Sequence, residues 1–213
     1  MIDTIRERLQ ACWSRSDEIF DLVEPDSLYE QPIALRHPLI FYLGHLPAFA
    51  WNQVCRGLLE MPSFRPGFDS LFERGIDPMG VDRHEESADW PSVAEIIEYR
   101  DRTRQGLLDA IEPIAERADR DPLAEGGRIF EVAIEHELMH HETLQYIRQQ
   151  LPLDRKRRPE AMPPSRFDGA VTQGVITVDG GPVVLGADFD SIPFGWDNEF
   201  PLLETEVDRF VID

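Results

Sequence analysis

The sequence predicts a mainly α-helical protein: a four-helix bundle followed by the beginning of a strand-rich, mixed α/β domain. Three observations support this fold class. Long stretches of the first 152 residues carry apolar side chains at spacings of three and four, which is the period of an amphipathic helix. One of these stretches is apolar on nearly all sides. After Pro152 the pattern changes to short β-branched runs separated by Gly and Pro, which is typical of strands and tight turns.

The first two expected helices are bounded by prolines. Residues 3–23 form an apolar stripe that ends before Pro25. Pro38 suits the first turn of a second helix, which should run to about residue 61. Because this second stretch is apolar on nearly all sides, we expect it to be a central, buried element. Pro47 removes a backbone donor within it, so a kink is expected there.

The third and fourth expected helices follow a long connection. Residues 62–91 contain several aromatic side chains and should fold over the bundle, since a loop of this length is uncommon without a role. Ser92 and Glu95 have capping-box spacing, which predicts that a third helix begins there and runs to about residue 117. The fourth helix should cover residues 128–151.

These elements predict two domains. Residues 1–152 form the expected bundle, in which one long crossover joins the second and third helices. Residues 153–170 contain several prolines and the basic run 155–158, which we interpret as a solvated linker. Residues 171–213 contain three short strands with tight turns, the start of a second domain.

Composition excludes several classes of protein. The chain has 41 acidic and 21 basic residues and a net charge of −20, which disfavours binding to nucleic acid. No apolar run approaches the ~18 residues that a membrane span needs, and the N-terminus lacks the apolar centre of a signal peptide. We therefore expect a cytoplasmic protein with no membrane partner. Cys12 and Cys55 are isolated within helical patterns and are expected to be buried, reduced thiols.

The chemistry of the chain is concentrated in residues 134–142, Ile-Glu-His-Glu-Leu-Met-His-His-Glu. On a helix with about 3.6 residues per turn, His136 and His140 lie one turn apart on the apolar face. Two inward imidazoles at this spacing predict a metal site; the alternative is a pair of core histidines satisfied by their neighbours. The apolar stripe leaves three polar residues off its face: Glu135, His141 and Gln149.

His45 is the natural third ligand. A histidine within an apolar helix is costly unless its ring nitrogens find partners, and a metal ion would provide one. Three neutral imidazoles leave coordination positions open, and both zinc and iron(II) accept such ligands. Glu142 either orients a ligand ring or is solvated.

The same stretch also matches His-Glu-x-x-His, the zinc peptidase pattern in which Glu137 would be the general base. That reading is disfavoured because the third ligand it requires downstream would have to be Glu160, in the proline-rich linker.

The residues just described, with their flanks, resemble the nonheme iron(II) sulfoxide synthases of ergothioneine biosynthesis and their ovothiol and selenoneine synthase relatives. The resemblance lies in four segments that occur in the family's order and span nearly the whole chain. One of them reads His136-Glu-Leu-Met-His140-His-Glu-Thr-Leu, and another Phe194-Gly-Trp-Asp-Asn-Glu. The four segments are residues 36–52, 72–78, 136–144 and 194–199.

The resemblance implies a DinB-like four-helix bundle joined to a domain like the sulfatase-modifying, formylglycine-generating enzymes. It implies Fe(II) held by His45, His136 and His140. It also implies an O2-dependent reaction that joins a thiol, such as cysteine or γ-glutamylcysteine, to N-α-trimethylhistidine (hercynine) with formation of a sulfoxide. In the family the later part of the second domain supplies a catalytic acid, so no catalytic residue is assigned here. The chain is expected to be an N-terminal portion that lacks this later part.

Two positions depart from the family pattern and leave the donor open. Met139 stands where some members have a Gln that touches the substrate imidazole. Arg83 lies in the stretch where some members carry an Arg pair that binds the γ-glutamyl donor, so both residues are expected to contact substrate. The alternatives are a selenoneine or ovothiol synthase relative, a zinc or nickel thiol-dependent transferase on the same bundle, and a structural bundle with packed histidines.

Overall fold

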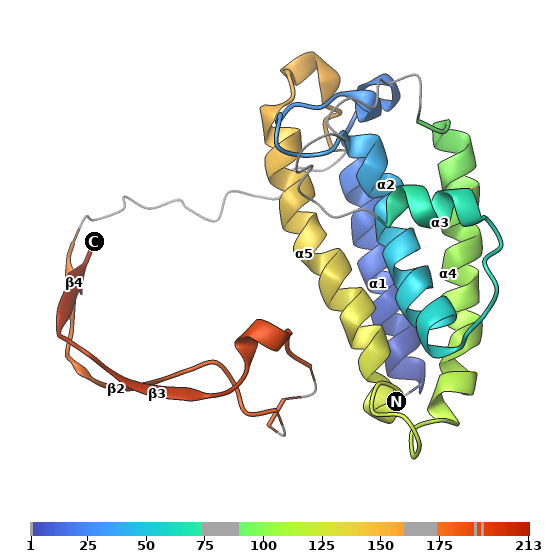
Figure 1. Ribbon diagram of the computed structural model, residues 1–213. Coiled ribbons are helices and arrows are strands. Elements are labelled where there is room, and N and C mark those ends of the chain that lie inside the picture. The colour runs from blue at the N-terminus through green and yellow to red at the C-terminus, as the bar shows by residue number, and fades with distance from the viewer. Residues whose placement is uncertain (1, 74–89, 160–173, 190, 193) are drawn as a thin grey trace. The chain divides into compact units, whose positions relative to one another are not determined.

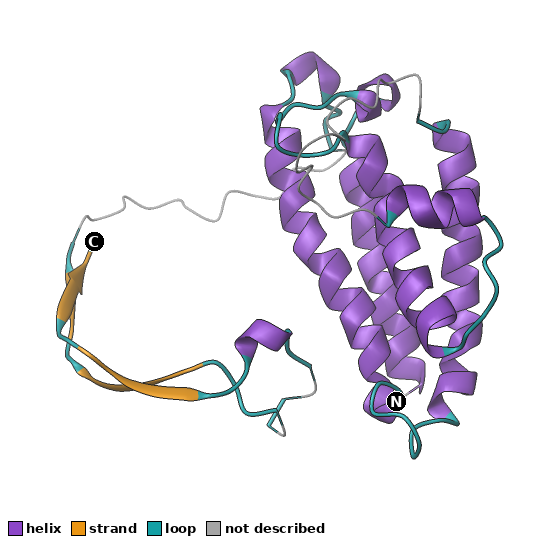
Figure 2. Ribbon diagram, viewed as in Figure 1, coloured by secondary structure: helices purple, strands orange, loops and turns teal. Residues whose placement is uncertain are grey.

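The computed structural model describes residues 2–73, 90–159, 174–189, 191–192 and 194–213. The chain divides into two compact units, Met1–Pro159 and Glu160–Asp213. The first is helical and the second contains the strands (Figures 1 and 2). The expected mainly helical fold is therefore confirmed. Of the linker expected at 153–170, the portion from residue 160 onward lies outside the described residues.

Four long helices in the first unit contact one another in a closed circuit. Both α1 and α2 pack against α4 and α5, and the shorter α3 packs against α2. Most helix ends agree with the sequence-based boundaries to within about two residues, which is the ordinary scatter of such boundaries. The bounds are Ile2–Asp21 for α1, Leu39–Ala50 for α2, Val93–Ala115 for α4 and Arg128–Gln150 for α5.

The second helix differs from expectation at its C-terminal end. Every residue of α2 except Phe49 is buried, as its apolar sequence predicts. The helix does not continue as α-helix to residue 61 but changes at Trp51 to a π-helical stretch, η2 (Trp51–Leu58). Pro47 lies inside α2, and the kink expected there stays a prediction.

The connection expected at residues 62–91 contains a further helix, α3 (Pro66–Phe72), with Pro66 in its first turn. Phe68 and Phe72 are buried in the cluster that surrounds α2. Gly44 allows this approach, because a Cβ atom at that position would overlap the Phe72 ring. The expectation that aromatic side chains of this segment cover the bundle thus holds for α3, while residues 74–89 lie outside the described part.

The N-terminus of α4 has the predicted capping box. The backbone N–H of Glu95 donates to the Ser92 hydroxyl at 3.3 Å, and the backbone N–H of Ser92 donates to the Glu95 carboxylate at 3.0 Å. Both bonds satisfy backbone donors that the first helical turn leaves unpaired. Pro113 lies inside the last turn of α4.

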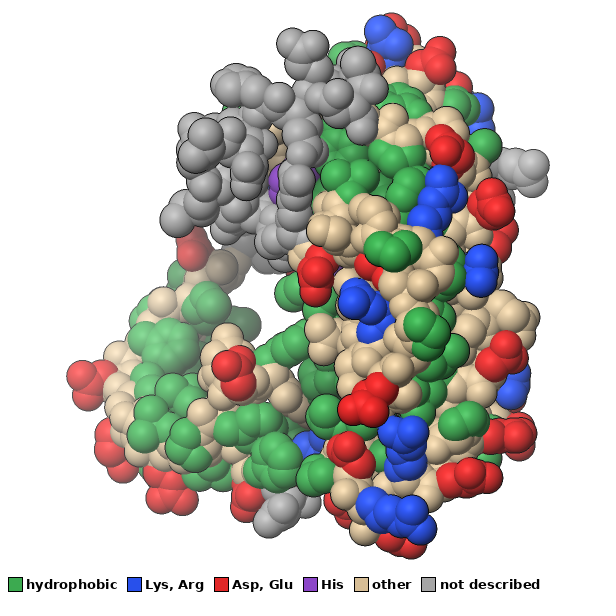
Figure 3. Space-filling view, turned by 45° about the vertical axis from the view of Figure 1, so that its right-hand side comes forward, with side chains coloured by type: hydrophobic (Ala, Val, Ile, Leu, Met, Phe, Trp, Pro, Cys, Tyr) green, Lys and Arg blue, Asp and Glu red, His purple; other side chains and the backbone are tan. Residues whose placement is uncertain are grey.

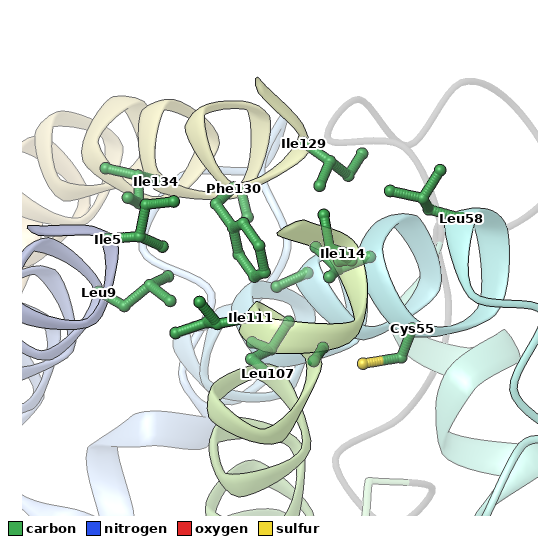
Figure 4. Close-up of a cluster of buried hydrophobic side chains, with 14 of the residues drawn as sticks. Ile5, Leu9, Cys55, Leu58, Leu107, Ile111, Ile114, Ile129, Phe130 and Ile134 are labelled. Atoms are coloured by element: carbon green, nitrogen blue, oxygen red, sulfur yellow. The ribbon is translucent and has the colours of Figure 1, made fainter. Parts of the chain in front are cut away.

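Two clusters of buried side chains form the core. The first joins α1, η2, α4 and α5, and its labelled members point toward one another in Figure 4. The second surrounds the N-terminal part of α2 and includes Phe41, Phe72 and Tyr99. The labelled members of the first cluster are Ile5, Leu9, Cys55, Leu58, Leu107, Ile111, Ile114, Ile129, Phe130 and Ile134.

The basic run after α5 contacts the loop that follows α1. Val23 and Lys156 form an isolated antiparallel bridge. Arg155 pairs with Glu30 at 3.4 Å, and Arg157 pairs with Glu24 at 3.2 Å. These basic side chains therefore serve as ion-pair partners within the first unit. On the face shown in Figure 3, acidic and basic side chains of the described residues are intermixed.

The described residues of the second unit form four strands where the sequence predicted three. β1 (Ile176–Val178) pairs antiparallel with β4 (Phe210–Ile212), and β2 (Gly181–Leu185) pairs antiparallel with β3 (Leu203–Val207). The register does not shift between the two pairs, so together they form one long two-stranded ribbon. Most of its side chains are exposed. The sulfatase-modifying-factor-like identity of this unit stays a prediction.

In the part of the chain that the structure describes, no helix combines the length and apolarity needed to cross a bilayer.

Candidate metal centre

Three histidines from two helices converge in the first unit. His45 lies on α2, and His136 and His140 lie one turn apart on α5. One ligand nitrogen of each ring lies within 4.8 Å of the other two. All three side chains are buried, with exposed fractions of 4%, 6% and 0%. The structure therefore brings together the three residues that the sequence nominated as metal ligands.

A backbone carbonyl fixes the orientation of His45. Its Nδ1 lies 2.7 Å from the carbonyl oxygen of Phe72, at the end of α3. Because a carbonyl oxygen can only accept, Nδ1 must carry the proton and Nε2 must carry the lone pair. That Nε2 atom is buried and has no hydrogen-bond partner among the described residues. An oriented, unpaired nitrogen is what a metal ligand requires.

The two histidines of α5 turn the same ring atom toward each other. Their Nε2 atoms are 3.2 Å apart, and the Nδ1 atom of each ring is buried without a hydrogen-bond partner in the described structure. A buried polar atom without a partner is costly. An ion bound by the facing Nε2 atoms would replace the contact between them, and the Nδ1 atoms would then carry the ring protons.

Burial keeps the three rings neutral. It lowers the pKa of His45 to about 4, an effect that neighbouring His37 reinforces and the hydrogen bond to Phe72 opposes. Burial, with repulsion from the other two rings, lowers the pKa of His136 to about 2. Burial and repulsion from His45 and His141 lower that of His140 to about 3. Neutral imidazole is the form that binds metal, so the site is prepared for an ion near neutral pH.

The donor set restricts the metal. Among the described residues the cluster of three ligand atoms contains imidazoles and no carboxylate or thiolate. Such a set suits zinc, iron, nickel or copper better than magnesium or calcium, which prefer oxygen. Three protein ligands also leave positions for water or substrate. The residues present therefore fit Fe(II), although they fit zinc and nickel as well.

Aromatic rings line the histidines, and the sequence reasoning did not identify them as part of the site. Phe49 stacks on His136, with ring centroids 3.5 Å apart and an interplanar angle of 9°. Phe41 stacks on His45 at 5.0 Å and 19°. The available signal was the spacing of four between Phe41, His45 and Phe49, which places all three on one side of α2.

The other predicted site residues lie elsewhere. Met139 and Glu142 are on the exposed side of α5, and Met139 is 44% exposed. Among the described residues, Glu142 makes no hydrogen bond or ion pair, so its expected role in orienting a ligand ring has no contact to support it. Arg83 lies outside the described residues.

Glu137 and His141 point toward α1 and not toward α2, which carries His45. Both contact Ser16 of α1: Glu137 accepts a hydrogen bond from its hydroxyl, and His141 Nε2 lies 2.7 Å from the same oxygen. A peptidase base would instead have to face the metal ligands, so this geometry argues against the zinc peptidase alternative. His141, expected to lie off the buried stripe, is 8% exposed, because α5 buries one side against α2 and another against α1.

The helical unit matches a known family. Residues 8–144 match the DinB superfamily, and the chain therefore belongs to that superfamily. The chain is also 34% identical, over 94% of its length, to Ergothioneine biosynthesis protein 1 of Neurospora crassa. It is 32% identical, over 59% of its length, to the Schizosaccharomyces pombe protein of the same name. These findings confirm the resemblance seen in the sequence. The chain spans 25% and 17% of the lengths of these two relatives.

Proposed function

We propose that this chain is the metal-binding part of an iron(II)- and O2-dependent sulfoxide synthase of ergothioneine biosynthesis. The reaction would join hercynine to a thiol such as cysteine or γ-glutamylcysteine. The observation that carries the proposal is the convergence of three neutral, buried imidazoles within 4.8 Å, in a chain similar to ergothioneine biosynthesis proteins. A purely structural role would leave the buried Nε2 atom of His45 without a partner.

The proposed reaction balances without an external reductant. A C–H bond of the hercynine imidazole and the S–H bond of the thiol break, and a C–S and an S–O bond form. One oxygen atom of O2 enters the sulfoxide, and the other leaves as water with the two hydrogens. The four electrons that reduce O2 come from the carbon and sulfur centres. Bound iron(II) would supply the one-electron chemistry that lets O2 react with these substrates.

The residues of the chain have definable tasks in this proposal. His45, His136 and His140 would hold the ion and leave coordination positions open. The Phe72 carbonyl keeps the proton of His45 on Nδ1, so that Nε2 is always available. Phe49 and Phe41 pack flat against two of the ligand rings, which restricts ring rotation and excludes water from that side.

Metal binding tests the first half of the proposal. The full chain would be reconstituted anaerobically with iron(II), desalted and analysed for metal. We expect one tightly bound equivalent at the three-histidine site, lost in His136→Ala. It should remain in His37→Gln, a matched control that removes a buried imidazole outside the cluster. Retention of this equivalent in His136→Ala would refute the assignment of the ligands.

Product analysis separates the synthase from a zinc or nickel transferase. Tight zinc binding alone would not distinguish the synthase from the transferase, because a given site generally binds zinc more tightly than iron(II). The proposed synthase, of which this chain would be the metal-binding part, should form the sulfoxide only with iron(II), O2, hercynine and thiol together. Transfer to a thiol under anaerobic conditions with zinc would favour the transferase. Comparing cysteine, γ-glutamylcysteine and a selenium donor would identify the donor.

A further inference from the structure

A second group of metal-binding side chains lies on the other buried side of α5. Cys12 comes from α1, and Glu137 and His141 come from α5. The thiol sulfur, a carboxylate oxygen and a ring nitrogen of these residues lie within 4.8 Å of one another. All three residues are buried. None of them belongs to the three-histidine cluster.

The arrangement is built from two matched pairs. Cys12 and Ser16 are four residues apart on α1, and Glu137 and His141 are four residues apart on α5. Residues at this spacing share one face of a helix. The contact between α1 and α5 therefore turns four potential ligand side chains toward one point, with the Ser16 hydroxyl between Glu137 and His141.

We propose that Cys12, Glu137 and His141 form a second metal site, selective for zinc or a similar thiophilic divalent ion. Sulfur, imidazole nitrogen and carboxylate oxygen are the three donor types that zinc takes in proteins, with a fourth position completing a tetrahedron. The Ser16 hydroxyl, or a water molecule, would occupy that fourth position. The donor set differs from the first cluster by its thiol and carboxylate, so the two sites would prefer different ions.

The state of Glu137 supports a cation in this place. Its side chain is only 5% exposed, and it accepts a hydrogen bond from the Ser16 hydroxyl. Among the described residues it forms no direct ion pair: Arg100 and Arg104 pair with Asp17, at 3.0 and 2.7 Å, and act on Glu137 only from a greater distance. A buried carboxylate without a direct ion pair is costly, and a bound divalent ion would reduce that cost.

A small cavity adjoins the Ser16 and Glu137 side of the group. A cavity of about 10 Å³ lies between α1, α2, α4 and α5 and is lined in part by Ser16 and Glu137. This is close to the space that one water molecule needs. Among the described residues, the one hydrogen bond of the Cys12 side chain is a weak 3.9 Å contact from its sulfur to the Ile134 carbonyl, which a metal–sulfur bond would readily replace.

A second ion would have a structural consequence. His136 and Glu137 are adjacent in the sequence, so their side chains project about 100° apart around the axis of α5. One ion would link α5 to α2, and the other would link α5 to α1. The second ion would thereby fix the rotation of the helix that carries two ligands of the first.

Cobalt(II) is the appropriate probe, since a cobalt–thiolate bond gives an intense near-ultraviolet charge-transfer band that imidazole and carboxylate ligands do not give. The test uses the full chain with His45→Ala, which removes a ligand of the first site only. We expect the band to be present in this background, present with Cys55→Ala added, and absent with Cys12→Ala added. Cys55 is the matched control because it is the only other cysteine in the sequence and is also buried.

Zinc stoichiometry gives an independent measure. Wild type should bind two equivalents, His45→Ala one, and His45→Ala with Cys12→Ala none. In the His45→Ala background zinc should raise the midpoint of thermal unfolding, and Glu137→Gln should abolish that increase. Circular dichroism without metal identifies variants that fail to fold, and Cys12→Ser then replaces Cys12→Ala.

The outcomes separate this site from the proposed function. A thiolate band that is absent in His45→Ala, or that persists when Cys12 is replaced, would overturn the second site and leave the iron proposal untouched. A band that depends on Cys12 in a chain that binds no iron would support the second site and count against the iron proposal.

Discussion

Gly44→Ala should damage the metal centre without touching a ligand. A Cβ atom at Gly44 would overlap the ring of Phe72, which is fully buried and surrounded by other aromatic rings. The helix containing Phe72 must therefore move away from α2. Because the carbonyl of Phe72 holds His45 Nδ1 at 2.7 Å, the same movement would release the His45 ring.

The magnitude follows from two opposing terms. Overpacking a filled core costs about 1–3 kcal/mol, whereas alanine in place of glycine inside a helix gains up to about 1 kcal/mol. We expect a net loss of about 1–2 kcal/mol in the free energy of unfolding. Loss of the bond that orients a metal ligand typically weakens metal affinity by about 10–100-fold.

Urea unfolding and metal titration would measure both effects. Gly67→Ala in α3 is the matched control, since nothing lies within 4 Å of a Cβ atom placed there. That variant should be neutral or slightly stabilised and should bind metal normally. Adding Phe72→Leu to Gly44→Ala should restore part of the metal affinity, because the smaller side chain makes room while the carbonyl remains. If Gly44→Ala matched Gly67→Ala in both assays, the coupling between α3 and His45 would be refuted.

Three further predictions concern pH, thiols and a helix cap. The metal-free protein should lose stability as pH falls from about 6.5 toward 4, because the three rings of the cluster bind protons in the unfolded state but not in the folded one. The loss should be on the order of 1 kcal/mol per pH unit for each histidine. Urea unfolding at several pH values would measure it, and a pH profile of stability that His45→Gln leaves unchanged would contradict it. Burial raises the pKa of both Cys12 and Cys55 to about 12. Neither thiol of the metal-free protein should therefore react with a disulfide reagent at pH 8, whereas both should react in concentrated urea. Rapid reaction of either thiol under native conditions would contradict this prediction. Ser92→Ala removes the capping box of α4 and should lower the free energy of unfolding by about 1 kcal/mol. The urea midpoint would measure this loss, with Ser70→Ala at an exposed position as the control. Equal midpoints for the two variants would mean that the cap does not stabilise the protein.

Periodicity predicted the long helices because each of them repeats its apolar pattern over several turns. The seven-residue α3 was missed, since two turns give too few repeats to distinguish a helix from a loop. The π-helical stretch after Ala50 was missed as well. It covers only eight residues, which is too short for its different side-chain period to stand out from that of an α-helix.

The predicted site was accurate where side-chain spacing alone determines proximity. His136 and His140 had to be neighbours on one helix, and the apolar surroundings of His45 indicated a special partner. The Phe72 carbonyl was beyond prediction, because every residue has one and only the placement of α3 selects it. The burial of His141 was missed because the sequence analysis assumed a single buried face on α5. In the structure α5 packs against both α1 and α2, and a second face is buried as well.

The strand-rich unit restricts how its own sequence can change. Val178 faces Phe210 and Gly181 faces Val207, so pairing continues in the same register past Gly180. A Cβ atom at Gly180 would come within 2.8 Å of the opposite backbone, which bars larger residues from that position. Inserting one residue in one arm would turn every later side chain of that arm to the other face. The ribbon can therefore lengthen or shorten only through paired insertions or deletions, one in each arm.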